Sequence, residues 1–433
     1  MPEHEPQEEK ELNFRDLFIP LTNTKVIWFI IIIGLIVFGN GLFNSFVGDD
    51  MLQIIENPVI HSITHLPTFF SGGTFYNGGG QKLGGAFYRP ITATLYSMTY
   101  TLFGSSAFAF HFVLMLLFII NACFLFLVFK QFFEKHLAFV LSLIFLVHPI
   151  NSETALYVSD TQDVLFFFFG IVALWILQHY QSKKTFVAAS FLLLFSLLSK
   201  ETGILFLFIT VAYIFICKRK YFSRWLASIL PLIGVYVVLR ISVIGLITKT
   251  IANAPIQKLD LLTRLINIPE VFLFYLKTFI FPVELSSSYQ WVYTQIDFNH
   301  FFLPLLIDLL FLGGIVGSAV FLHKNYARKY FLHYVFFVMW FLCGILLHLQ
   351  IIPLDKTVAV RWFYFPIVGI LGMIGVLFEA FRVTTKNIWV LSIAFILIGL
   401  LATRTFIRTF DYRNELTLVR HDIPVSPVAY DLE

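Results

Sequence analysis

The sequence predicts an all-α, polytopic membrane protein. Three observations lead to this fold class: 58% of the 433 residues are hydrophobic, only 13% are charged, and the mean hydropathy is +0.82. Soluble domains carry roughly a quarter of charged residues, so about half the usual charge is missing. No ordinary protein core could enclose this much apolar surface, and the surplus must therefore face lipid.

The runs that are predicted to span the membrane follow from their length, because a spanning helix needs about 20 apolar residues. Clear candidates lie at 26–43, 107–129, 164–177, 225–247, 301–322, 331–351, 358–381 and 388–402. Shorter runs lie at 137–148, 185–198 and 203–217. We expect these to span as well, with their polar ends shielded by protein. The fold class is thus a bundle of about eleven transmembrane helices.

Lysine and arginine set the predicted orientation, because short cytoplasmic loops carry an excess of both. Such residues follow alternate spans: Lys130, Lys135, Lys183, Lys184, Lys218, Arg219, Lys220, Arg224, Lys324, Arg328, Lys329, Arg382 and Lys386. Placing them inside also places the N-terminus inside. The segment 271–282 breaks the parity, so we expect it to lie along the outer interface as a juxtamembrane helix.

The chain is accordingly divided into three parts. Residues 1–25 are predicted to be a cytoplasmic tail, and the run that follows a retained anchor, because no small-residue cleavage pattern accompanies it. Residues 26–405 form the transmembrane domain, which includes a long outer loop at 44–89. Residues 406–433 are expected to be an extracytoplasmic tail.

Composition also bears on partners. The net charge of +4 is modest and the basic residues form short clusters between apolar runs, so no nucleic-acid partner is expected. The cysteines Cys123, Cys217 and Cys343 lie in or at the ends of apolar runs without metal-ligand spacing. We assign no metal ligands from the sequence.

The acid pair Asp49-Asp50 directly follows the first span. Two adjacent carboxylates repel, which tends to raise the pKa of one of them toward the range of a general base. A helix cap or a solvated turn is the alternative. Most other acids of the chain also fall in the outer loops, and charge at helix mouths indicates function unless it is paired or hydrated.

Cations lie on the same predicted face. Arg89 ends a Gly-rich loop and is followed by a proline, which suits presentation to a phosphate, although an interfacial lipid headgroup would serve equally. Lys200 and Glu201 interrupt two apolar runs and form either an ion pair or part of a phosphate site. Arg361, with Tyr364 one turn further, indicates an anionic ligand or an arginine that extends to the headgroups.

A rim segment contributes His148 and Glu153. Pro149 ends the preceding helix and leaves both side chains at the membrane surface. A lone histidine at a helix end is more often a structural hydrogen-bonding group, and the spacing of the nearby acids fits no strong metal pattern. Together these motifs gather a carboxylate pair and several cations on one face, as needed to hold a lipid-linked phosphate and deprotonate a hydroxyl.

The order of the motifs resembles that of a known family. The chain contains, in sequence, Asp49-Asp50, Asn57, Tyr88-Arg89-Pro90, His111, His148-Pro149, Glu153, Asp163, Lys200-Glu201, Phe281-Pro282 and Arg361. This order is similar to the membrane part of the transmembrane and tetratricopeptide-repeat O-mannosyltransferases and their bacterial relatives, within the GT-C superfamily. The resemblance covers most of the chain from about Phe46. The sequence has Thr161 where the family often has arginine, and the Gly-rich insertion has no counterpart.

The resemblance implies an inverting glycosyltransferase. Such enzymes move a sugar, here mannose-like, from a polyprenyl-phosphate carrier to a protein, glycan or lipid acceptor on the extracytoplasmic face of the plasma or inner membrane. Asp49 or Asp50 would be the base. No cofactor is required because the leaving group is already a phosphate, although some GT-C relatives use a divalent ion. The residues expected to bind substrate and carrier phosphate are Arg89, His148, Glu153, Lys200, Glu201, Arg361 and Tyr364.

Two other functions remain open from the sequence. A transporter or flippase would be expected to show inverted repeats and charge at mid-membrane, whereas no repeat is visible and only Arg240 and Asp308 depart from the rim. A non-catalytic membrane scaffold would be expected to bury the acid pair in a salt bridge.

Overall fold

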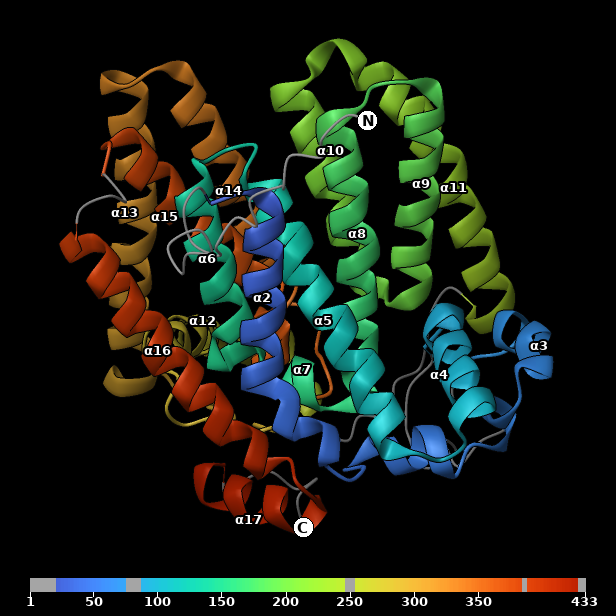
Figure 1. Ribbon diagram of the computed structural model, residues 1–433. Coiled ribbons are helices and arrows are strands. Elements are labelled where there is room, and N and C mark those ends of the chain that lie inside the picture. Colours follow the sequence, from blue (N-terminus) through green and yellow to red (C-terminus); the bar gives the residue numbers. More distant parts are fainter. Residues whose placement is uncertain (1–20, 75–86, 246–253, 384–387, 427–433) are drawn as a thin grey trace, which may run out of the picture.

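The computed structural model describes a protein that is helical throughout its ordered core (Figure 1). The described residues are 21–74, 87–245, 254–383 and 388–426. Within them no strand occurs, and Tyr289 and Val358 form one isolated antiparallel bridge. The predicted all-α fold class is confirmed. Parts of the predicted N-terminal tail, Gly-rich insertion and C-terminal tail (1–20, 75–86 and 427–433) lie outside the described residues.

Two groups of helices build the bundle. The upright helices, with which we group the strongly tilted α16 (Figure 1), are α2 (Asn23–Phe38), α5 (Ala107–Phe129), α6 (Lys135–Val147), α8 (Thr161–His179), α9 (Lys183–Ser199), α10 (Ile204–Cys217), α11 (Phe222–Ile244), α13 (Leu303–Asn325), α14 (Arg328–Leu346), α15 (Pro366–Ala380) and α16 (Ile388–Asp411). The shorter or crossing helices are α3 (Leu66–Ser71), α4 (Pro90–Phe103), α7 (Ser152–Leu156), α12 (Leu261–Ile280) and α17 (Glu415–Val425). Every apolar run predicted to span coincides with an upright helix.

The predicted number of eleven spans is not confirmed. Among the described residues, 7 helices are long and apolar enough to cross a membrane, or up to 8 if the bent pair of α6 with the Pro149–Leu156 helix is one span. The shorter helices α10 and α15 have 14 and 15 residues. At 1.5 Å per residue they measure about 22 Å, less than the roughly 30 Å hydrocarbon core. α15 is buried along most of its length, so protein rather than lipid surrounds it.

The two ends of the bundle differ in chemistry. The turns from α8 to α9, from α10 to α11 and from α13 to α14 share one end, at the top of Figure 1, and carry the lysines and arginines predicted to be inside. The helices α3, α4, α7 and α17 lie at the opposite end. This arrangement agrees with the alternation of loops in the predicted topology, and it gathers the candidate site residues at the end away from the basic turns.

The crossing helix α12 begins earlier than the juxtamembrane segment 271–282 predicted from the sequence. Figure 1 shows it nearly end-on, across the direction of the upright helices. Its side chains Val271, Phe272 and Tyr275 are buried against the bundle, whereas Leu262 and Leu265 are exposed. The loop that follows α12 leads to the end of the bundle away from the basic turns (Figure 1).

The helix pair α14 and α15 is packed through glycines. A Cβ atom on Gly369 would lie 2.4 Å from the backbone nitrogen of Phe341, and one on Gly372 would lie 2.0 Å from the Phe337 ring. Small residues allow membrane helices to approach closely in this way. The close approach holds α15 against α14, directly after the segment that carries Arg361.

We predict that Gly369→Ala destabilises the protein, because the added methyl group meets backbone that cannot rotate away. Overpacking of this kind costs about 1–3 kcal/mol, which we expect as a fall in melting temperature measured in detergent. Gly317→Ala on α13 is the control, since a Cβ atom there meets nothing within 4 Å. An unchanged melting temperature for Gly369→Ala would show that the helices are not in contact at this point.

Candidate functional site

The acid pair lies in a tight turn after α2. A 3₁₀ turn (Gly39–Phe43) follows the helix, and the chain then reaches Gly48, whose φ of +52° favours glycine. A Cβ atom at Gly48 would also lie 2.8 Å from the Tyr157 hydroxyl oxygen. The amide of Asp49 donates a hydrogen bond to this hydroxyl at 2.7 Å. The glycine thus allows the turn to approach Tyr157, which fixes the backbone of Asp49.

The two carboxylates of the pair have different environments. Asp50 is fully buried and accepts hydrogen bonds from the amide and hydroxyl of Ser159 at 2.7 and 2.6 Å and from the amide of Val47 at 3.1 Å. Burial raises the pKa of Asp50 to about 7, against the lowering effect of the Ser159 and Val47 bonds. Asp49 is only partly buried, and in the described part of the chain its carboxylate has no hydrogen bond or ion pair. Asp50 therefore holds the turn, and Asp49 is available to a substrate.

Arg89 and Glu201 form the first of the predicted cation sites. The Arg89 Nε atom lies 3.0 Å from the Glu201 carboxylate, and the guanidinium also donates to the side chain of Gln162. Glu201 accepts a second arginine, Arg240 of α11, at 3.1 Å. Two guanidinium groups therefore share one carboxylate, which leaves one positive charge uncompensated in this cluster.

Lys200 and Arg361 form a second cluster around the start of α8. The Lys200 ammonium lies 2.7 Å from Asp163. The Arg361 guanidinium lies 2.6 Å from Glu153 and 3.4 Å from Asp160. Burial alone would lower the pKa of Arg361, but these two carboxylates outweigh it and raise this pKa well above its usual value.

The balance of charge in this second cluster depends on Asp160, because burial raises the pKa of this carboxyl group well above its usual value and favours its neutral form. Three carboxylates face two cations, and the Oδ2 atom of Asp160 is buried without a hydrogen-bond partner in the described structure. A small pocket adjoins the cluster and is lined by Asp163, Thr202, His348 and Arg361. Among the described residues, no group of three or more His, Cys, Asp or Glu side chains is arranged to hold a metal ion.

Two predicted residues have structural partners instead. His148 contacts the carbonyl of Phe279 through Nε2 at 2.9 Å and accepts the Ile150 amide at Nδ1, so both ring nitrogens are engaged. The Tyr364 hydroxyl accepts a hydrogen bond from Asn121 at 3.0 Å. Its ring is buried among phenylalanines and forms part of the wall of the pocket. We therefore leave His148 out of the proposed substrate contacts and keep Tyr364 as a wall residue.

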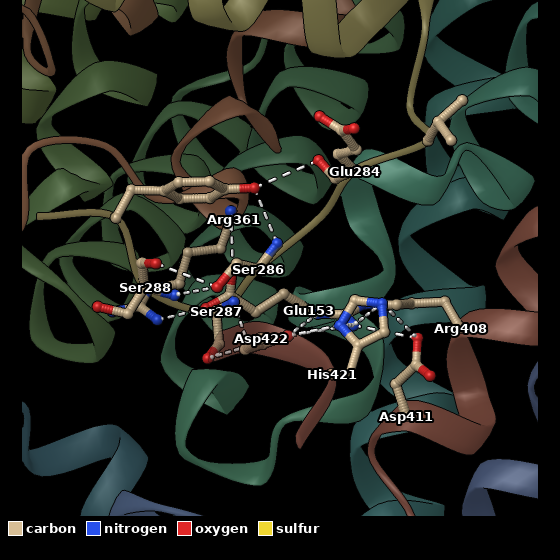
Figure 2. A network of polar contacts seen from close by, with 12 residues as sticks. Glu153, Glu284, Ser286, Ser287, Ser288, Arg361, Arg408, Asp411, His421 and Asp422 are labelled. Atoms are coloured by element: carbon tan, nitrogen blue, oxygen red, sulfur yellow. Dashed lines mark hydrogen bonds and ion pairs between the residues drawn. The ribbon is translucent and has the colours of Figure 1, made fainter. Parts of the chain in front are cut away.

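Several residues at the site carried no signal in the sequence. Tyr157 and Ser159 lie within the rim segment, but neither is charged, and nothing in their spacing indicated that they contact the acid pair. Arg240 stood out only as a charge inside an apolar run. Figure 2 shows a further polar network near Arg361 and Glu153, in which Asp422 of α17 meets the loop after α12.

The chain is similar in sequence to known mannosyltransferases. Residues 89–247 match the family model described as dolichyl-phosphate-mannose-protein mannosyltransferase. The protein O-mannosyl-transferase F38B6.6 of Caenorhabditis elegans is 24% identical over 395 residues, which are 88% of this chain and 55% of the relative. The human protein O-mannosyl-transferase TMTC3 is 27% identical over 151 residues, 35% of this chain and 16% of the relative. The chain spans about half the length of the first of these relatives and less of the second.

A solved structure shares the fold. The Archaeoglobus fulgidus oligosaccharyltransferase with a tethered acceptor peptide superposes with a TM-score of 0.52 at 13% identity, covering 92% of this chain and 56% of that chain. Together the sequence comparisons confirm the predicted resemblance to O-mannosyltransferases, and the superposition shows a shared fold. The chain is an integral, multi-pass membrane protein.

The raised pKa of Asp50 predicts a pH-dependent stability. Because this pKa is about 7 in the folded protein and 3.8 ordinarily, the folded state binds the proton more tightly. Below about pH 4 this tighter proton binding stabilises the folded protein by at most about 4 kcal/mol. The stabilisation is lost as the pH rises through 7.

We therefore expect the melting temperature of the wild type to fall more steeply between pH 4 and pH 7.5 than that of Asp50→Asn, which cannot ionise. Melting curves recorded across this range in one detergent would measure the difference. Parallel curves for the two proteins would show that Asp50 is already ionised in the folded protein at low pH.

Proposed function

We propose that this protein is an inverting glycosyltransferase that moves a mannose-like sugar from a polyprenyl-phosphate carrier to a hydroxyl-bearing acceptor on the extracytoplasmic face. One observation carries the proposal: Asp49 is a partly exposed carboxylate without a partner among the described residues, held by its backbone beside the buried Asp50. The matched mannosyltransferase family and the relatives' activity support the sugar, and the relatives favour a protein acceptor over a glycan or lipid.

The proposed reaction is a single displacement. The acceptor hydroxyl attacks the anomeric carbon from the face opposite the phosphate while the Asp49 carboxylate accepts its proton. The bond between the anomeric carbon and the phosphate oxygen breaks, and the electron pair leaves with the carrier phosphate. The configuration at the anomeric carbon inverts because attack and departure occur on opposite faces. Since the leaving group is a phosphate that cations stabilise, the reaction as proposed requires no cofactor.

The balance of charge favours Arg89 as the partner of the carrier phosphate. Arg89 and Arg240 share Glu201, so one positive charge is left for an anion. Arginine suits this role because its planar fork binds phosphate oxygens in pairs. Arg240 belongs to α11, a helix whose side chains are mostly exposed in the molecule, so a lipid carrier can approach this cluster from the membrane.

Lys200 and Arg361 are assigned a different part in the proposal. Both already have carboxylate partners, so neither cation is left to bind a phosphate. The oxygens of these carboxyl groups can instead accept hydrogen bonds from the hydroxyl groups of a sugar. We therefore place the sugar, rather than the phosphate, next to Glu153 and Asp160.

We predict that Asp49→Asn lowers the rate of sugar transfer about 10²–10⁴-fold, the usual contribution of a general base. The substitution keeps the size of the side chain and removes its ability to accept the proton. The measurement is transfer of labelled mannose from polyprenyl-phosphate mannose to a Ser/Thr-rich peptide. Glu284→Gln is the control, because Glu284 is another exposed carboxylate of the outer end, without a side-chain partner in the described structure. Wild-type rates for Asp49→Asn, Asp50→Asn and the double variant would refute the assignment of the base.

We predict that Arg89→Gln raises KM for the polyprenyl-phosphate donor about 10–100-fold, since a hydrogen bond to a charged group contributes about 1.5–3 kcal/mol. The fold should tolerate the change because Arg240 still neutralises Glu201. Initial rates at varied donor concentration give KM. Lys258→Gln, which removes an exposed cation near the start of α12, should leave KM unchanged. An unchanged KM for Arg89→Gln would place the phosphate elsewhere.

A further inference from the structure

We propose that helix α17 is a clasp that positions the two loops of the candidate active site, with Asp422 and Glu415 as positioning residues. This inference rests on the proposed function for its effect on the reaction, but the contacts themselves are independent of it. The sequence indicated only a tail for this part of the chain. In the structure, α17 turns back from the end of α16 and its Leu418 and Asp422 side chains are buried.

The first half of the clasp consists of hydrogen bonds between Asp422 and the loop after α12. One carboxylate oxygen of Asp422 accepts hydrogen bonds from both the amide and the hydroxyl of Ser287, each at 2.7 Å. The other oxygen lies 3.3 Å from the buried guanidinium of Arg408 and 2.8 Å from Nδ1 of His421 (Figure 2). Burial by itself would raise the pKa of Asp422, but the bonds from His421 and Ser287 and the charge of Arg408 keep this pKa below its usual value. The loop is therefore bound to α17 through an ionised carboxylate, both oxygens of which have hydrogen-bond partners.

This loop in turn is connected to the segment that bears Arg361. The carbonyl of Tyr289 accepts the amide of Thr357 at 3.0 Å, within the isolated bridge of Tyr289 and Val358. The Lys356 ammonium donates to the carbonyl of Ser287 at 2.9 Å. Displacement of Ser287 would consequently move the backbone that leads into Arg361.

The second half of the clasp holds the turn of the acid pair. The Glu415 carboxylate, in the first turn of α17, accepts a hydrogen bond from the amide of Gly48, the residue before Asp49. The amide of Ser45 donates to the carbonyl of Arg413 at 3.0 Å, and Asn44 donates to the carbonyl of Thr409 at 3.2 Å. The turn of the acid pair thus touches the junction of α16 and α17 at three points.

One short helix, α17, therefore contacts both the acid turn and the loop after α12. The acid turn contacts α17 directly, whereas the Arg361 segment is connected to α17 through the loop after α12. A catalytic base must be placed within a fraction of an ångström of its proton, and a displacement of about 1 Å can lower a rate about 10²-fold. A positioning role therefore predicts a loss of kcat with little change in the binding of the donor.

The test uses the full chain in nanodiscs and the variants Glu415→Ala, Glu415→Gln and Asp422→Ala. Hydrogen–deuterium exchange is followed at residues 44–50 and 284–290, together with mannose transfer from polyprenyl-phosphate mannose. Glu415→Ala should accelerate exchange at 44–50, and Asp422→Ala should accelerate it at 284–290. Both should lower kcat about 10–100-fold with KM for the donor within about threefold. Glu415→Gln keeps an acceptor oxygen for the Gly48 amide and should retain kcat within about threefold.

Arg420→Gln is the control, because Arg420 is exposed on the same helix and, among the described residues, has no hydrogen bond or ion pair to either loop. Since Glu415 is exposed, its variants test the clasp even where Asp422→Ala fails to fold. Unchanged exchange at 44–50 in Glu415→Ala would overturn the clasp. Altered exchange with a wild-type kcat would overturn the positioning role. If the wild-type protein transfers no mannose while exchange responds as expected, the clasp stands and the proposed function fails.

Discussion

The structure of the bundle end that carries the candidate site depends on the cost of burying charge. A carboxylate or cation away from water is tolerated only with a partner, and breaking such a pair costs about 3–5 kcal/mol. The pairs here join segments far apart in the chain, since Arg361 and Glu153 are separated by 208 positions and Arg89 and Glu201 by 112. These ion pairs connect the start of α8, the start of α10 and the Arg361 segment, and so help to fix how the three lie relative to one another. The geometry available to a substrate follows from that arrangement.

Much of the fold could be predicted from the sequence because a segment that crosses lipid must form a helix of apolar residues. The positions of α5, α11 and α13 follow directly from apolar runs of sufficient length. The count of spans could not be predicted in the same way. The apolar runs of α10 and α15 are too short for a span, and whether such a helix faces lipid or protein depends on packing at positions such as Gly369, which periodicity does not reveal. The bend between α6 and α7 likewise arises at Pro149, where one apolar run becomes two helices.

The sequence identified the charged residues of the candidate site, but it did not identify which of them pair with one another. The sequence indicated that Asp49, Arg89, Lys200 and Arg361 share one face, and the structure places them at one end of the bundle. It could not indicate that Glu201 serves two arginines, because Arg240 lies 39 residues away on another helix. Nor could it distinguish Asp49 from Asp50: the difference between them comes from Ser159 and Val47, uncharged partners without a recognisable pattern. The acid pair is held by these neutral donors and not by a salt bridge, which argues against a scaffold that has lost its reaction.

The short length of α10 has a consequence for the membrane itself. Its outer end adjoins Glu201, Arg89 and Arg240, while Phe208 and Phe215 along its side are exposed. A helix shorter than the hydrocarbon layer draws the bilayer thinner around it. With about 21 Å of helix against roughly 30 Å of hydrocarbon, the leaflet at this end of the bundle would be drawn inward at this position. In the reaction proposed above, the phosphate of a lipid carrier would then lie closer to the level of the arginines while its isoprenoid tail stayed in the lipid.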